Sequence, residues 1–138
     1  MVGIGMLVGG VASQAPDLEA TLVRASIEGM EHGDLRVLAV LVTWFGVHAA
    51  GVDADRLTRL VVLRTSKRVR AFWSALARWR AAGQSFTKLA RAYRGPRVDL
   101  LSTGNNFQVA RHGEDPRFAG SKLRVPTNVL RDRSADVH

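Results

Sequence analysis

The sequence predicts an α+β fold in which a helical bundle is followed by a small C-terminal β-hairpin. Apolar residues repeat at helical spacing from residue 16 to residue 96, and beyond Pro96 short apolar runs alternate with turn residues. The size also fits, because 138 residues with 46% hydrophobic and 23% charged content suit one globular domain. We expect a flexible leader over residues 1–15, a helical core over 16–96, and a hairpin with a tail over 97–138 packed on that core.

The most apolar stretch covers residues 35–50, which carry a single charge. A helix that is apolar on nearly every face is buried in a protein core or in lipid. Sixteen residues rise about 24 Å, which is short of the roughly 20 residues of a membrane span. We therefore expect a buried central helix between the N-cap Asp34 and the stop signal Gly51, with Trp44 anchored in the core and His48 hydrogen-bonded inside it.

Helix signals also mark the neighbours of this stretch. Pro16 and Asp17 open a helix that Gly33 ends, and Asp53 caps a second helix that runs to about Leu63. The central helix and the helix after it then have the layout of a helix-turn-helix, which also occurs in helical domains that never contact DNA.

The clearest amphipathic pattern covers residues 67–82. Its apolar side chains repeat at helical spacing at Val69, Phe72, Trp73 and Leu76. We expect them to pack on the central helix, the alternative being that the aromatic rings stack on nucleic-acid bases. Because Lys67 and Arg68 are unfavourable at the positive end of a helix dipole, either the acidic N-terminal third or a bound phosphate must compensate them. A short helix after Ser85 completes the bundle.

Residues 97–101 and 107–111 look like short strands, and the turn-rich residues 102–106 separate them. They predict a hairpin that, following a set of helices, is compatible with the wing of a winged-helix domain. Residues 122–125 are a third candidate strand. The polar residues 112–116 are interpreted as a turn rather than an acid-base site.

Charge is strongly segregated along the chain. The net charge is +8, with −5 over residues 1–55, +12 over residues 56–98 and +1 over residues 99–138. Residues 56–98 contain no acidic residue, a pattern that predicts binding of a polyanion. The alternative is a solvated surface that the acidic N-terminal third neutralises, within the chain or in a homo-oligomer.

If nucleic acid is the partner, the basic helical face from Arg56 to Arg97 supplies the phosphate contacts, with Arg97 or Arg111 on the wing. The nucleic-acid-binding residues that we predict are Arg64, Lys67, Arg68, Arg70, Arg78, Arg80, Arg97 and Arg111.

Other chemistry has little support in the sequence. The absence of cysteine excludes disulfides, thiolate metal sites and thiol nucleophiles, and it suits the cytoplasm. No histidines stand at ligand spacing, and no strand precedes the N-terminal glycines as a dinucleotide-binding loop requires. We therefore predict a protein that is not an enzyme, has no metal or cofactor, and does not bind membranes.

The order of helices, basic helix, hairpin and tail resembles small bacterial proteins that accompany nucleotidyltransferase-type toxins as antitoxins or regulatory partners. In the tail, residues 113–118 (GEDPRF), 123–126 (LRVP) and 130–133 (LRDR) contribute to the resemblance. It implies neutralisation of a partner without catalysis, and transcription regulation through operator binding. Two hypotheses follow: a DNA-binding regulatory protein, or a protein-interaction module whose basic face binds an acidic partner.

Overall fold

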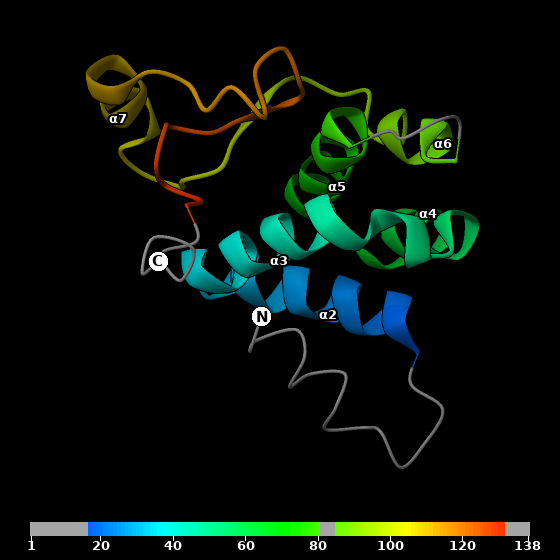
Figure 1. Cartoon of the computed structure of the whole chain (residues 1–138). Helices are drawn as coiled ribbons and strands as arrows, with labels where there is room; N and C mark the ends of the chain where they lie inside the picture. The colour runs from blue at the N-terminus through cyan, green and yellow to red at the C-terminus, as the bar shows by residue number, and fades with distance from the viewer. Residues whose placement is uncertain (1–16, 81–84, 132–138) are drawn as a thin grey trace.

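The computed structural model describes residues 17–80 and 85–131. The first part holds the longer helices and one 3-10 turn: α2 (Leu18–Glu31), α3 (Leu35–His48), η1 (Ala49–Gly51), α4 (Ala54–Arg64) and α5 (Lys67–Trp79). The second part holds α6 (Thr87–Ala90), β1 (Val98–Asp99), α7 (Asn105–His112) and β2 (Leu123–Arg124). In Figure 1, α2 lies along α3, α5 rises behind them toward α6, and α7 stands apart from the helical body.

The helix starts predicted from the sequence are confirmed. The Asp17 carboxylate accepts a hydrogen bond from the Ala20 amide at 3.2 Å, and Asp34 and Asp53 accept equivalent bonds at the starts of α3 and α4. Ser66 caps α5 in the same way. Each cap satisfies an amide that the first helical turn leaves without a partner, so these four residues set where the helices begin.

The core is centred on α5 rather than on α3. Trp73 is completely buried, and its ring meets Phe45 of α3 and Phe72 edge-on, with centroids 5.7 and 5.6 Å apart. The indole N–H of Trp73 donates to Ser26 of α2 at 2.9 Å. The expected packing of the amphipathic helix is therefore confirmed over Lys67–Trp79, while residues 81 and 82 lie outside the described part of the chain.

The prediction of a fully buried α3 is wrong for its outer face. Val47 is 72% exposed, and Trp44 is only half-buried, its ring 4.9 Å from the exposed ring of His48. One side of α3 packs on α2 and α5, and Val47 on its outward side is left exposed. No helix among the described residues is long and apolar enough to cross a membrane.

A mainly helical fold with a small β element near the C-terminus is confirmed, but the hairpin is wrong. Residues 107–111, expected as a strand, lie in α7, and β1 pairs instead with β2 in parallel, Val98 opposite Leu123. Gly104, at φ +74°, starts the helix, and Gly113, at φ +81°, ends it. The wing expected from these residues does not form, because the partner strand comes from the candidate strand at residues 122–125.

The C-terminal segment packs on the helical core. Arg68 of α5 donates to the Leu100 carbonyl, and β1 and β2 both contact α5. Phe118, Leu123 and Val125 are completely buried. The leader expected over residues 1–15 and the end of the tail lie outside the described residues.

Candidate nucleic-acid interface

Three of the eight predicted binding residues are held by the protein itself. The guanidinium of Arg68 donates to Leu100, and that of Arg70 donates to the Val62 carbonyl at 3.0 Å. Arg97 donates to the Ser121 carbonyl at 2.8 Å and pairs with Glu114. These three side chains join α5 or β1 to neighbouring segments, so their first role is to hold the fold together.

Burial shifts the titration of one of these residues. Burial, followed by the neighbouring charge of Arg124, lowers the pKa of Arg97 from its ordinary value. Since that ordinary value is far above neutrality, the side chain stays charged at pH 7. Its charge is already opposed by Glu114, so Arg97 is a weaker phosphate ligand than its place in the sequence indicates.

Arg80 occupies a different environment, on an aromatic ring. Its guanidinium carbon lies 4.4 Å from the centre of the Trp79 ring, and that of Arg117 lies 5.9 Å from the same ring. Arg117 is held in turn by Asp115 at 2.7 Å and by the Leu130 carbonyl at 3.1 Å. The stack connects the end of α5 to the C-terminal segment. Arg117 was missed from the sequence because it directly follows residues 112–116, which were interpreted only as a turn.

The other four predicted residues are exposed: Arg64, Lys67, Arg78 and Arg111. Within the described residues they take part in no hydrogen bond or ion pair. The charge of Arg64 does act on a carboxylate, because it contributes to lowering the pKa of Asp17.

In the described part of residues 56–98, four further cations with the same properties were missed from the sequence: Arg59, Lys88, Arg91 and Arg94. The signal that could have found them was the absence of acidic residues from 56 to 98, since a cation in such a stretch has no carboxylate close to it in sequence. We call seven exposed residues the cationic surface: Arg59, Arg64, Lys67, Arg78, Lys88, Arg91 and Arg94. They lie on α4, α5 and α6 and on the segment after α6, and Arg64 also borders a cavity between α2 and α5.

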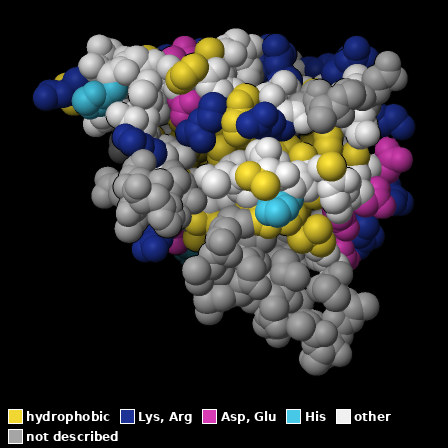
Figure 2. Space-filling view, viewed as in Figure 1, with side chains coloured by type: hydrophobic (Ala, Val, Ile, Leu, Met, Phe, Trp, Pro, Cys, Tyr) yellow, Lys and Arg dark blue, Asp and Glu magenta, His cyan; other side chains and the backbone are white. Residues whose placement is uncertain are grey.

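The charge segregation of the sequence persists in space. In Figure 2, Lys and Arg side chains follow the upper right edge over α6, while acidic side chains gather lower on the right, where α4 begins. There Asp17 pairs with Arg56, and Glu19 accepts the Asp53 amide at 3.0 Å. Some carboxylates of the acidic N-terminal third thus stabilise helix starts. Among the described residues, none of its carboxylates forms an ion pair with a side chain of the cationic surface.

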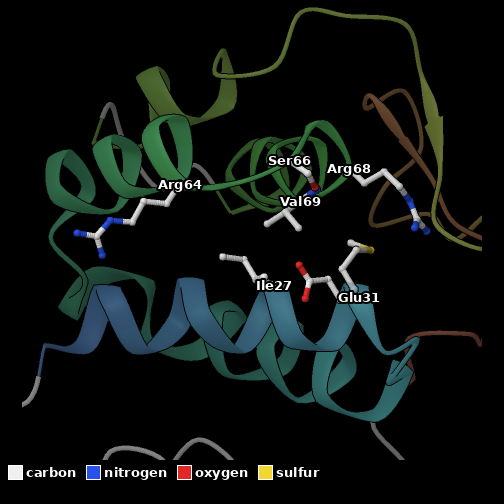
Figure 3. A pocket seen from close by; sticks show the side chains of 7 residues that line it. Ile27, Glu31, Arg64, Ser66, Arg68 and Val69 are labelled. Carbon is white, nitrogen blue, oxygen red and sulfur yellow. The ribbon is translucent and has the colours of Figure 1, made fainter.

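The start of α5 has a carboxylate beside it. A cavity of about 150 Å³ lies between α2 and α5, and Glu31 extends into it beside Ser66 and Val69 (Figure 3). Arg68 extends away from this cavity toward Leu100 (Figure 3). Glu31 therefore lies near the basic start of α5 without an ion pair to it in the described structure.

Neither the polar turn nor the cavities assemble a recognisable reaction centre. Glu114 and Asp115 are each paired with an arginine, as expected for a structural turn. Across the described ranges, no three His, Asp or Glu side chains are grouped as a metal would require. A wider hollow of about 560 Å³ lies between the α2–α3 turn and residues 100–103, and its lining is mixed polar and apolar.

Comparison with protein families, with curated proteins and with solved structures finds no match to this chain.

Proposed function

We propose that the protein is a non-enzymatic nucleic-acid-binding regulator of the cytoplasm, with DNA as its ligand. The observation that carries the proposal is the cationic surface, whose seven side chains are exposed and have no ionic partner in the described structure. Unpaired cations on adjacent elements raise the local potential, and phosphates neutralise them with release of condensed counterions.

Seven of the eight predicted residues divide by their contacts, and the eighth, Arg111, lies on α7, outside the cationic surface. Arg64, Lys67 and Arg78 belong to the cationic surface and bind phosphates directly. Arg68, Arg70 and Arg97 support the surface from inside, because each bridges two segments of the fold. Arg80 remains available at its edge, with one side of its guanidinium against Trp79.

The test is a salt titration of binding to labelled DNA. The affinity should fall steeply with salt, and the slope of log K against log salt should decrease by about 0.9 for each duplex phosphate contact removed. The variant Arg91→Gln/Arg94→Gln removes two cations of the surface. Its matched control is Arg24→Gln/Arg36→Gln, which removes two exposed cations from α2 and α3.

We expect the first variant to lower the slope by about two and the control to leave it unchanged. Binding that is flat with salt, or an equal effect of the two variants, contradicts the proposal. In the second case the net charge of the chain, and not this surface, attracts the DNA.

A second function has an observation of its own. Leu63 is 78% exposed and Val62 is 42% exposed at the end of α4, close in sequence to Arg59 and Lys67. Exposed apolar residues among cations are typical of protein interfaces, which favours a module that binds an acidic partner, as the resemblance to antitoxins implies. A stoichiometric complex with an acidic protein, lost in Leu63→Asp, together with no affinity for DNA would favour this function over the first.

A further inference from the structure

The helix α7 is presented to solvent rather than packed. Among the described residues it makes no extensive contact with another helix or strand, and it lies at the side of the molecule in Figure 1. Its first residue anchors it: Asn105 is only 3% exposed, and its side-chain oxygen accepts the Leu101 amide at 3.2 Å. Asn106 is held by Arg124. At the other end the C-cap Gly113 accepts a hydrogen bond from the Thr127 amide at 2.9 Å. The helix is thus held at both ends while its outer face stays open.

The outer face of α7 combines an aromatic ring with a cation. Phe107 is 61% exposed, unlike Phe45, Phe72 and Phe118, which are completely buried. Arg111 follows at i+4, so the two side chains are neighbours on the same side of the helix. Arg111 is exposed and unpaired within the described chain, and α7 contains no acidic residue.

This composition argues against docking into an apolar groove of a partner protein. Helices that bind in such grooves present apolar anchors at i, i+3 or i+4, and i+7. On α7, Phe107 is the only large apolar side chain that is exposed, and the positions beside it are Asn106, Ala110 and Arg111. A single aromatic ring next to a cation is instead the combination that binds unpaired bases, with the ring stacking on a base and the cation binding a phosphate.

We propose that Phe107 and Arg111 form a stacking platform for single-stranded nucleic acid, Phe107 contacting an unpaired base and Arg111 an adjacent phosphate. The inference rests on the proposed function, since it specifies the form of nucleic acid that the protein prefers. A duplex offers its base faces only at its ends, so the platform selects unpaired segments. Stacking on a ring tolerates every base, so the preference is for strandedness more than for sequence.

The experiment measures fluorescence anisotropy of three labelled ligands with the full chain: a single-stranded DNA, a single-stranded RNA of the same sequence and the matching DNA duplex. Phe107→Ala should weaken single-strand binding roughly 5-fold or more and leave duplex binding nearly unchanged. Phe107→Trp should retain the affinity, whereas Phe107→Leu, which stays apolar but cannot stack, should lose it. The control is Val47→Ala, which truncates another exposed apolar residue, on α3, and should change nothing.

The outcomes separate this inference from the function on which it rests. If all three ligands bind with steep salt dependence but Phe107→Ala has no effect, the platform is wrong and the cationic surface stands. Retention of affinity in Phe107→Leu would overturn stacking in favour of a general apolar contact. If none of the ligands binds, both proposals fail. If the single strands bind, the difference in affinity between RNA and DNA shows whether ribose matters to the site. Because Phe107 is exposed, all variants should melt like the parent, which circular dichroism can verify.

Discussion

The buried hydrogen bond between Trp73 and Ser26 offers the sharpest test of the core. Both residues are completely buried, and the Trp73 indole N–H donates to the Ser26 hydroxyl, which donates in turn to the Val23 carbonyl at 2.7 Å. Ser26→Ala leaves the indole N–H without a partner in an apolar environment. A buried donor left unpaired costs about 1–3 kcal/mol, and the better helix propensity of alanine offsets only about 0.5 kcal/mol of it.

We therefore expect Ser26→Ala to lower the free energy of unfolding by about 1–2.5 kcal/mol. For a chain of this size, the melting temperature should fall by roughly 3–5 °C for each kcal/mol. Urea unfolding with an unchanged m-value would show that the change lies in stability. The exposed Ser102 provides the control, since Ser102→Ala should fall within about 0.5 kcal/mol of the parent.

A double-mutant cycle completes the test. Trp73→Phe removes the donor, so in that background Ser26→Ala no longer leaves an unpaired N–H. The double variant should be more stable than the sum of the single effects by about 1 kcal/mol or more. If the two substitutions add within about 0.5 kcal/mol, the hydrogen bond contributes nothing and the reasoning is refuted.

Three further predictions concern single positions. The hydrogen bond with Arg56 lowers the pKa of Asp17. The stability that this ionised carboxylate contributes is therefore present above its ordinary pKa near 3.8 and disappears as pH falls through the lowered value. Asp17→Asn, which keeps a cap, should differ from the parent in urea midpoint at pH 7 and converge with it in strong acid. Gly113→Ala should lower the free energy of unfolding by about 1–3 kcal/mol, because an L side chain is strained at φ +81° and ψ 179°. Gly51→Ala is the control and should be near neutral in the same thermal melts, because an added Cβ there meets no atom within 4 Å and the residue has no positive φ. Trp44→Ala should cost less than the about 3–5 kcal/mol of a fully buried aromatic truncation, since its side chain is only partly buried, and a larger loss in urea unfolding would restore it to the core.

The candidate site shows how far local reasoning reached. The run of sequence without carboxylates holds exposed, unpaired cations, yet it could not tell Arg78, which is exposed, from Arg70, which donates to a carbonyl of α4. The two lie eight residues apart on one helix and differ in what the next helix offers them. Similarly, Phe107 looked like a strand residue, and only its place on an open helix makes it a candidate ligand-binding group.

What the sequence by itself determined is local: where α2, α3 and α4 begin, and which side of α5 is apolar. These follow from Asp17, Asp34 and Asp53, whose side chains bond to amides three residues away, so no distant contact is needed. Only the tertiary structure decided that α5 occupies the centre and that Leu123 pairs beside Val98. A two-residue strand has too little pattern to choose its partner, and a helix as apolar as α3 does not reveal which of its faces the neighbours cover.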